Sequence, residues 1–487
     1  MDILYRKGDL VEVTITDFAE KQNCFGKLDL GIGALVRGVL APGDRISARI
    51  IKVRKRYIEA VFVELLQPSP DRVTPICGHF SVCGGCKLMH VSYPVQLMYK
   101  RRKLIDALEH LGSFASPPVA EVHAAPSALH YRNKIEFSFS ASRYLLPEEL
   151  TQKQLTKSKN FALGFHAPGN YEKIIEIEGC FLATKNMNRI LSMTRNFALS
   201  CSLAPYSPKQ HTGFLRHLVI RESASNGELM VNLVTSWHDF ELMQQYAAVL
   251  EHTLAGHSFT FLNNVTSRHS GVAFGEEEFL ITGSGVLVDR LGPLDFRISA
   301  NSFFQTNSAQ AEILYETILA FAELRPTDTV FDLYCGTGTI TLYLARYCRQ
   351  AIGLEVVAPA VSDARQNAVQ NSISNALFFE TDLKDFSRMQ ELLSTHASPR
   401  IIVTDPPRAG MHPKALQAML QYGAERIIYV SCNPSSLARD GKEIALHGYS
   451  LVAVQPVDMF PHTAHIECVA CFEQQHVAAH KPCSGDS

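Results

Sequence analysis

Two residues in the C-terminal part of the chain have the types needed to methylate a ring carbon. Cys432 lies in the sequence SCNP at residues 431–434, and Glu467 ends the sequence DMFPHTAHIE at residues 458–467. Carbon C5 of a pyrimidine is too weak a nucleophile to take a methyl group from a sulfonium centre, but thiolate addition at C6 makes it enolate-like. A base must then remove the C5 proton before the thiol leaves. The residue types predict Cys432 as nucleophile and Glu467 as base.

A glycine loop earlier in the sequence is a candidate site for the methyl donor. The sequence DLYCGTGT at residues 332–339 separates a predicted strand (329–333) from a predicted helix (340–347), and Glu355 ends the next predicted strand (351–355). Glycines let the backbone approach a ligand, and the acid can accept hydrogen bonds from ribose hydroxyls. The loop lacks the Gly-Lys-Ser/Thr ending of a P-loop and is shorter than the dinucleotide fingerprint, so it favours S-adenosylmethionine over NAD.

Two further strand ends would face the same crevice. Asp405 follows the predicted strand 400–404 and precedes a Pro-Pro pair, and Cys432 follows the predicted strand 426–430. Because the carboxyl ends of parallel strands meet at one edge of a sheet, the stiff proline pair would hold the Asp405 carboxylate at that edge. The alternatives are a simple turn at Asp405 and an ordinary buried thiol at Cys432. The position of Asp405 and Cys432 at the same edge of the sheet favours a functional role for both residues over these alternatives.

A separate group of cysteines predicts a metal site. Cys77, Cys83 and Cys86 form the pattern C-x5-C-x2-C, with Gly84-Gly85 between the last two thiols. Closely spaced thiolates bind structural zinc or iron–sulfur clusters, and the spacing does not choose between the two. The pattern differs from the C-x3-C-x2-C that would indicate radical chemistry on S-adenosylmethionine.

The elements that must position these residues fall into regions of different pattern. Strand-like runs separated by glycine turns predict a small β-barrel in residues 1–66. Residues 67–300 contain a predicted helix around 93–112, which we expect to pack on the C-terminal domain, and otherwise read as α+β. Alternating helices and strands in residues 301–473 predict a doubly wound, mostly parallel sheet. The polar tail 474–487 is predicted to be disordered.

Composition limits the classes of function. The chain has 487 residues, of which 46% are hydrophobic, and its formal net charge of −2 gives no global attraction to phosphate. Two basic runs, 49–56 and 100–103, are candidate nucleic-acid contacts, although the second reads equally well as a solvated face. The sequence lacks a signal-peptide core and any apolar run that could span a bilayer, which predicts a cytoplasmic protein, without membrane contact, whose cysteines stay reduced. We expect a monomer.

Five motifs together resemble one known family. They are FFQTN at 303–307, DLYCGTG at 332–338, DPPRAG at 405–410, SCNP at 431–434 and the stretch that ends at Glu467. The chain resembles the S-adenosylmethionine-dependent RNA uracil-5-methyltransferases, and most of all their 23S ribosomal RNA members with an N-terminal TRAM domain. The resemblance implies an α/β, Rossmann-like class I methyltransferase domain, preceded by an OB-like TRAM barrel that grips RNA and by an α+β central RNA-binding domain.

The resemblance also implies roles for individual residues. Cys432 and Glu467 keep the roles derived above, and Gln305 and Asp405 are implied to lie near the target uracil. The residues implied to surround S-adenosylmethionine are Gln305, Tyr334, Gly336, Thr339, Glu355, Asp382 and Asp405. A relative has asparagine at the place of Thr339, so only that position is carried over.

For the cysteine group, the resemblance favours a [4Fe-4S] cluster. Its ligands would be Cys77, Cys83, Cys86 and the distant Cys180, with Cys201 as the competing fourth ligand. Because methyl transfer needs no redox step, we expect the cluster to shape the RNA-binding domain. Structural or incidental roles are expected for Cys24, Cys335, Cys348, Cys468, Cys471 and Cys483, and no proton-transfer role for His462 and His465.

The expected function is methyl transfer from S-adenosylmethionine to C5 of a specific uridine in 23S ribosomal RNA, through a covalent adduct between Cys432 and C6. The target base would have to be flipped out of its stack. The basic run 49–56 would contact phosphates without reading sequence. The alternatives are the same reaction on the T loop of transfer RNA, methylation of an amino group, and a non-catalytic iron–sulfur RNA-binding protein.

Overall fold

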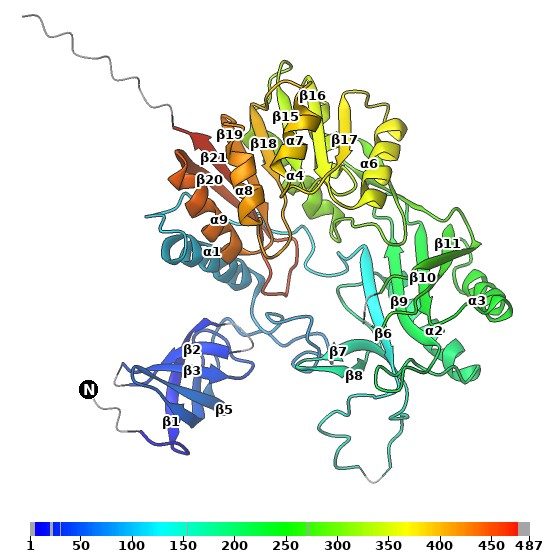
Figure 1. Cartoon of the computed structure of the whole chain (residues 1–487). Coiled ribbons are helices and arrows are strands. Elements are labelled where there is room, and N and C mark those ends of the chain that lie inside the picture. Colours follow the sequence, from blue (N-terminus) through cyan, green and yellow to red (C-terminus); the bar gives the residue numbers. More distant parts are fainter. Residues whose placement is uncertain are drawn as a thin grey trace, which may run out of the picture.

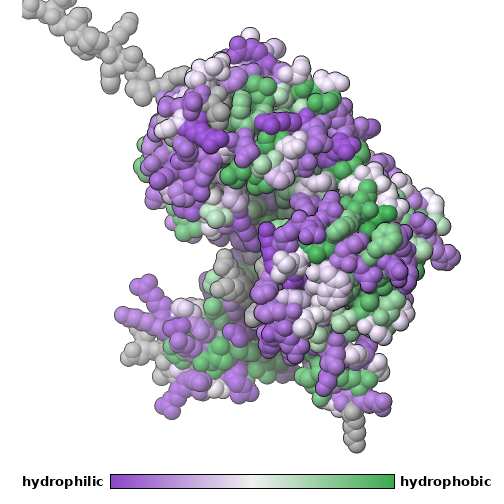
Figure 2. Space-filling model, turned by 45° about the vertical axis from the view of Figure 1, so that its right-hand side comes forward, coloured by the Kyte–Doolittle hydropathy of each residue, from purple (hydrophilic) through white to green (hydrophobic). Residues whose placement is uncertain are grey.

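The computed structural model describes residues 5–19, 23–29, 31–152, 154–269, 271 and 273–475. Figure 1 shows a small barrel at the N-terminal end, a central sheet with two helices, and a C-terminal α/β sheet. Figure 2 shows a surface that is hollowed where the barrel faces the two larger bodies. Among the described residues, no helix combines the length and the apolar character needed to cross a membrane.

The N-terminal body is the predicted β-barrel. Side chains alternate between buried and exposed along its strands, as expected when one face of each strand covers a core. Val13, Val36, Ile46 and Ile50 are among the residues that fill this core. The strands close in the order β1-β2-β3-β5-β4, with bounds β1 (Leu10–Phe18), β2 (Asn23–Lys27), β3 (Gly33–Arg37), β4 (Arg45–Val53) and β5 (Tyr57–Gln67).

The first helix, α1 (Tyr93–His110), connects the barrel region to the C-terminal sheet. A proline at its start suits the first turn of a helix, where a backbone N–H would have no partner. Residues spaced by four, Gln96, Lys100, Leu104 and Leu108, are buried on one face. The two leucines share a core with residues of the C-terminal domain, so α1 packs there.

The central body has a seven-stranded sheet in the order β12-β11-β10-β9-β6-β7-β8. The β10–β11 pair is parallel and the other pairs are antiparallel, which fits the predicted α+β class. Helices α2 (Lys185–Ser200) and α3 (Phe240–Thr253) share its core. The strands are β6 (Lys134–Ser140), β7 (Ala162–Ala167), β8 (Asn170–Glu176), β9 (Leu215–Glu222), β10 (Leu229–Thr235), β11 (Phe259–Val265) and β12 (Glu277–Thr282).

The C-terminal body is the predicted doubly wound sheet, in the order β17-β16-β15-β18-β19-β21-β20. The first five strands are parallel, and β21 enters antiparallel between β19 and β20. The strands are β15 (Thr329–Leu333), β16 (Gln350–Glu355), β17 (Ala376–Glu380), β18 (Ile401–Thr404), β19 (Arg426–Ser431), β20 (Tyr449–Val457) and β21 (Glu467–Gln474). The helices are α4 (Ser308–Ala322), α5 (Thr339–Ala345), α6 (Ala358–Gln370), α7 (Phe386–Leu393), α8 (Pro413–Leu420) and α9 (Pro434–Leu446), and the hairpin β13 (Leu287–Leu291) and β14 (Leu294–Ile298) precedes them.

At the C-terminal end of the chain, β21 continues through Gln474, the first residue of the tail that was expected to be disordered. The next residue, Gln475, also contacts the domain, because its backbone N–H donates to the carbonyl of Gly448. The rest of that tail, residues 476–487, lies outside the described residues.

Candidate active site and cysteine centre

Cys432 occupies the turn between β19 and α9. Asn433 caps the helix, since its side chain accepts a hydrogen bond from the N–H of Ser435, and a proline follows at the first helical position. The thiol is half-buried, and burial raises its pKa to about 11. The nearby charges of Glu467 and Asp405 raise this pKa further, whereas Arg408 lowers it. The thiol is therefore neutral in the free protein and close to two carboxyl groups.

Glu467 reaches this turn because β21 is inserted beside β19. It is the first residue of β21, and its neighbour Cys468 pairs with Ser431, the last residue of β19. Only 7% of Glu467 is exposed, and burial raises the pKa of its carboxyl well above the ordinary value. Asp405 adds to that rise and Arg408 opposes it. The predicted nucleophile and base thus lie together at the ends of neighbouring antiparallel strands.

Asp405 follows β18 at the same edge of the sheet. Its backbone N–H donates to the carbonyl of Leu333 at the end of β15, which joins the loop to the neighbouring strand. Burial raises the pKa of the Asp405 carboxyl to about 6. The structure therefore brings the predicted Asp405 next to the predicted pair Cys432 and Glu467.

Arg408 is a site residue that the sequence analysis left without a role. Its positive charge lowers the pKa of both Cys432 and Glu467, so it favours the ionised forms that the proposed chemistry needs. The guanidinium lies 3.2 Å from Nδ1 of His465, and the Asn433 side chain donates to the Arg408 carbonyl at 2.9 Å. The signal was present in the sequence, because Arg408 follows Asp405 and the two prolines in the DPPRAG motif.

The glycine loop after β15 has the geometry of a ligand cradle. Tyr334, Gly336 and Gly338 have positive φ values of 65°, 54° and 80°. The Gly336 N–H donates to the Glu355 carboxylate at 3.1 Å, and an added Cβ at Gly336 would meet nothing within 4 Å. The loop, the acid that ends β16 and open space above the glycine therefore occur together, as an adenosine ligand requires.

The other residues expected around the cofactor lie at three neighbouring elements. Thr339 begins α5, and its hydroxyl accepts a hydrogen bond from Tyr315 at 2.9 Å, which leaves it free to donate one. Asp382 follows β17, and its pKa is lowered because its carboxylate accepts from the N–H of Lys384. Gln305 precedes α4, and its carbonyl accepts from the Asn133 side chain at 2.8 Å.

The loop between β20 and β21, residues 458–466, carries Glu467 at its end and is held from two sides. Lys100 of α1 donates to Asp458 Oδ1 at 2.5 Å and to the Phe460 carbonyl at 2.9 Å. The second contact comes from the loop that contains Cys77, Cys83 and Cys86. Its N–H groups of Lys87 and Leu88 donate to the His462 carbonyl at 2.8 and 2.9 Å. The basic run 100–103 was predicted to contact RNA or to form a solvated face. For Lys100 both predictions are wrong, because its side chain is fully buried.

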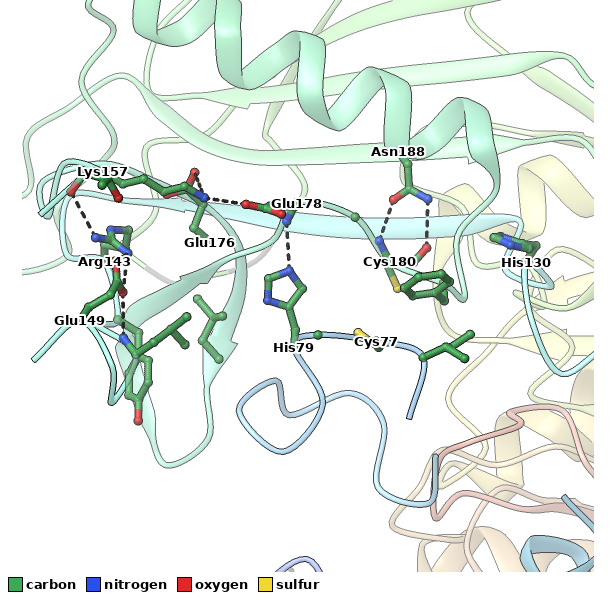
Figure 3. A pocket seen from close by; sticks show the side chains of 18 residues that line it. Cys77, His79, His130, Arg143, Glu149, Lys157, Glu176, Glu178, Cys180 and Asn188 are labelled. Carbon is green, nitrogen blue, oxygen red and sulfur yellow. Dashed lines mark hydrogen bonds and ion pairs between the residues drawn. The ribbon is translucent and has the colours of Figure 1, made fainter. Parts of the chain in front are cut away.

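The four expected cysteine ligands lie around shared cavities in the central region. One cavity of about 480 Å³ is lined by Cys77, Cys83, Cys86 and Cys180, and a neighbouring cavity of about 730 Å³ is lined by Cys77 and Cys180. Figure 3 shows these last two side by side, next to His79. Burial raises the pKa of Cys77, Cys83 and Cys86, and the other thiols raise it further. Cys201, at the end of α2, lines neither cavity.

Structural or incidental roles were expected for six other cysteines, and those that the structure describes are buried. Buried positions are occupied by Cys24, Cys335, Cys348, Cys468 and Cys471. Cys483 lies outside the described residues.

Comparison with known proteins identifies the family. The sequence model of the family described as tRNA (uracil-5-)-methyltransferase matches residues 223–475, and that of the TRAM domain matches residues 6–63. The chain belongs to the tRNA (uracil-5-)-methyltransferase family. The second match covers β1 to β4 and the larger part of β5, so the predicted TRAM domain is confirmed.

Members of this RNA methyltransferase family resemble the chain over nearly its whole length. An uncharacterized RNA methyltransferase of Chlorobaculum tepidum is 60% identical over 97% of this chain and 98% of its own length. A second uncharacterized RNA methyltransferase, from Bacteroides thetaiotaomicron, is 38% identical over 89% of this chain and 95% of its own length. The crystal structure of the Pyrococcus abyssi tRNA (uracil-54, C5)-methyltransferase in complex with S-adenosyl-L-homocysteine matches with a TM-score of 0.70 and 28% identity, over 95% of this chain and 100% of that chain. The chain is therefore an enzyme of the RNA uracil-5-methyltransferase family with the predicted fold class.

Proposed function

We propose that this enzyme transfers a methyl group from S-adenosylmethionine to C5 of a uridine in 23S ribosomal RNA through a covalent bond between Cys432 Sγ and C6. The observation that carries the proposal is the meeting of Cys432 and Glu467 at the ends of β19 and β21, with Asp405 and Arg408 close enough to shift the pKa of the Glu467 carboxyl. A thiol, a carboxyl and a cation in one partly buried crevice are the groups that this reaction needs.

The reaction then proceeds in three steps. The Cys432 thiolate forms a bond to C6, and the displaced electron pair makes C5 nucleophilic. S-adenosylmethionine, when bound, would supply an electrophilic methyl group; C5 would form a bond to it as the bond between the methyl carbon and the sulfonium sulfur breaks, which leaves S-adenosylhomocysteine. Glu467 as carboxylate removes the C5 proton, the C5–C6 double bond returns, and the bond between C6 and Cys432 breaks. Arg408 stabilises the negative charge on the thiol and on the carboxyl during these steps.

The methyl donor fits the cradle above β15 and β16. The open space at Gly336 and the Glu355 carboxylate beside it support this assignment. The proposed donor-binding residues are Gln305, Tyr334, Gly336, Thr339, Glu355, Asp382 and Asp405, of which Gln305 and Asp405 also contact the uracil.

Covalent trapping tests the mechanism. Incubation with substrate RNA and S-adenosylmethionine should give a denaturant-stable protein–RNA adduct with Glu467→Gln, because the methylated adduct cannot lose its C5 proton. Cys432→Ala should give no adduct and no methyl transfer. Normal turnover by Cys432→Ala would overturn the mechanism, and it would leave amino-group methylation, which needs no thiol, as the better explanation. A protein that transfers labelled methyl groups to no RNA would support the non-catalytic alternative.

The RNA substrate is tested separately. The 23S proposal rests on the resemblance of the motifs to the ribosomal RNA members, whereas the name of the matching family and the Pyrococcus relative favour transfer RNA. Mass spectrometry of 5-methyluridine in both RNAs, from cells with and without the protein, separates the two substrates. Loss of the modification from 23S ribosomal RNA alone is the expected result, and loss from transfer RNA alone would establish the alternative.

We also propose a [4Fe-4S] cluster held by Cys77, Cys83, Cys86 and Cys180. The cavity that all four cysteines line supports it. Protein purified without oxygen should contain about four iron and four sulfide ions. Cys180→Ser should lose iron, whereas the control Cys201→Ser should keep it. Equal iron in both variants, or zinc in the native protein, would contradict the assignment.

The remaining expectations stay proposals of the same kind. We propose a cytoplasmic monomer with domains 1–66, 67–300 and 301–473, the first two of which bind RNA. Light scattering of the purified protein tests the monomer, and limited proteolysis tests the domain bounds.

A further inference from the structure

The loop 458–466, which leads to Glu467, is clamped at His462. The His462 carbonyl accepts hydrogen bonds from the N–H groups of Lys87 and Leu88 at 2.8 and 2.9 Å. Its own N–H donates to Gln96 Oε1 at 2.9 Å, and Gln96 Nε2 lies 3.2 Å from His462 Nδ1. Both backbone polar groups of His462 therefore have partners from outside the loop, two from the segment before α1 and one from α1 itself.

The backbone of His462 adopts a conformation that needs such support. Its φ is 66°, in the left-handed region that residues other than glycine seldom adopt. A conformation of this kind persists where the surrounding contacts determine it, and the hydrogen bonds to Lys87, Leu88 and Gln96 do so here. Because Glu467 follows only five residues later, a change of φ at His462 would displace the proposed base.

The two carbonyls before His462 are also bound by distant segments. Lys100 Nζ donates to the Phe460 carbonyl at 2.9 Å, and the Tyr131 hydroxyl donates to the Pro461 carbonyl at 3.2 Å. Three consecutive carbonyls thus have partners from three different parts of the chain. The path of this loop is therefore determined by contacts with other segments.

One of these segments has little regular structure of its own. Residues 68–92, between β5 and α1, form neither helix nor strand apart from one isolated bridge, and this stretch is described throughout. It contains Cys77, Cys83 and Cys86, which line one cavity. A group bound by these three thiols would add the cross-links that the segment lacks, because metal binding and local folding are coupled.

Cys86 is joined directly to the two N–H groups that hold His462. The Lys87 N–H belongs to the planar peptide unit that begins at Cys86 Cα, and the Leu88 N–H belongs to the next unit. A ligand that fixes Cys86 therefore also fixes the direction in which the Lys87 N–H points.

We propose that residues 86–88 are a positioning segment of the active site. Cys86, fixed as a ligand of the proposed cluster, orients the Lys87 and Leu88 N–H groups, and these hold the turn at His462 that places Glu467. The inference rests on the proposed function and on the proposed cluster. It gives the cluster a structural effect on the catalytic base, in addition to shaping the RNA-binding domain, and it requires no electron transfer.

Loss of this positioning should affect one step of the reaction. In the proposed mechanism, Glu467 is needed to remove the C5 proton, whereas the bond between Cys432 and C6 and the bond to the methyl group form before that step. A displacement of about 1 Å can slow a step by about 100-fold. The methylated adduct should therefore accumulate while its rate of formation changes little.

The first test compares Cys86→Ala with Cys201→Ser, a matched control because Cys201 lines neither cavity near the proposed cluster. Both variants and the native protein are purified without oxygen, and their iron is measured. Each then reacts in a single turnover with substrate RNA and methyl-labelled S-adenosylmethionine. Cys86→Ala should lose iron, and its labelled, denaturant-stable adduct should last about 10 to 100 times longer than that of the native enzyme. The control should keep both the iron and the native adduct lifetime.

Three results would overturn the inference. They are retention of iron by Cys86→Ala, a native adduct lifetime in the iron-free variant, and complete absence of an adduct with that variant. The last result would mean that the cluster is needed for RNA binding or folding and not for the base.

Gln96→Met acts on the same turn without changing a cysteine. It removes both contacts of Gln96 with His462 and keeps all four proposed cluster ligands. Iron should stay at the native level, and the adduct should again persist. Breakdown of the adduct at the native rate would show that the turn at His462 does not position the base.

Hydrogen exchange, measured without RNA, separates a local effect from general unfolding. In Cys86→Ala, the amides of residues 458–466 should exchange faster than in the native protein, whereas those of β15 and β18 should keep their native rates. Equal acceleration in these two strands would contradict a local positioning role. Failure of the proposed function gives a different result, because the native enzyme would then form no 5-methyluridine. If the native enzyme forms it and the variants release the product normally, only this inference fails.

Discussion

Lys100 Nζ lies 2.5 Å from Asp458 Oδ1, and neither side chain is exposed to solvent. The Tyr93 hydroxyl donates to the other Asp458 oxygen at 2.9 Å, so both oxygens of the carboxylate have partners from α1. Because Asp458 begins the loop that ends at Glu467, this ion pair ties the position of the proposed base to a helix more than 300 residues away in the sequence.

We expect Lys100→Met to be strongly destabilising. It leaves the Asp458 carboxylate buried without its cation, a change that typically costs about 3–5 kcal/mol. Urea unfolding of the variant and the native protein measures the difference. The double variant Lys100→Met with Asp458→Asn should recover part of the loss, because no unpaired charge stays buried. Arg102→Ala, an exposed position on the same helix, should change stability by less than about 1 kcal/mol. Equal effects at both positions would disprove the role of the buried pair.

The pH dependence of covalent bond formation should follow the Cys432 thiol. Burial raises its pKa to about 11, so the thiolate fraction in the free enzyme grows about tenfold per pH unit below that value. Adduct formation by Glu467→Gln, measured in a single turnover at limiting RNA between pH 7 and 9, should therefore rise with pH. RNA binding by Cys432→Ala over the same range serves as the control and should stay constant. A flat rate of adduct formation would show that the thiol is already ionised.

Asp405→Asn should abolish activity and at the same time stabilise the protein. Burial raises the folded-state pKa of Asp405 to about 6 from 3.8, so the folded state disfavours the ionised form. The resulting cost is absent below pH 3.8, grows between the two values and is complete above pH 6. A shift of this size corresponds to about 3 kcal/mol at most, so we expect a gain of about 1–3 kcal/mol at pH 7 and almost none at pH 4.

Asp382→Asn is the matched control for that prediction. Its folded-state pKa is lowered by the hydrogen bond from the Lys384 N–H, so the ionised carboxylate favours folding and its loss should not stabilise the protein at pH 7. Unfolding curves of both variants at the two pH values test the contrast. A gain for Asp382→Asn equal to that for Asp405→Asn would mean that the removal of any acid at this edge has the same effect.

Gly338 in the donor loop and Gly423, between α8 and β19, separate the effect of crowding from that of backbone strain. Gly338 has a φ of 80°, and an added Cβ would lie 2.8 Å from the Phe378 ring and 2.9 Å from Ala364 Cβ. Gly423 has a φ of 58° with nothing within 4 Å of an added Cβ. Gly423→Ala should therefore cost about 1–2 kcal/mol from strain alone. Gly338→Ala should cost clearly more and also weaken S-adenosylmethionine binding, which calorimetry measures. Native donor affinity in Gly338→Ala would contradict the assignment of the loop.

The sequence by itself predicted the features that are encoded in short, contiguous stretches. The barrel followed from period-two patterns and glycine turns, and the Rossmann-like sheet followed from alternating helix and strand. Cys432, Asp405 and the glycine loop were found because parallel strands bring their carboxyl ends to one edge, so a polar residue after each strand is informative without coordinates.

Only the tertiary structure decided how distant segments meet. The sequence does not show that β21 enters antiparallel beside β19, yet this insertion brings Glu467 to Cys432. Nor does it show that Arg408 faces both groups. Lys100 was misjudged for the same reason, since a basic run on a helix normally lies in solvent. A charge can be buried only when an opposite charge from elsewhere reaches it, and here that charge is on Asp458. The local sequence pattern indicates which residues can take part in chemistry, whereas the long-range packing of the chain determines which of them meet.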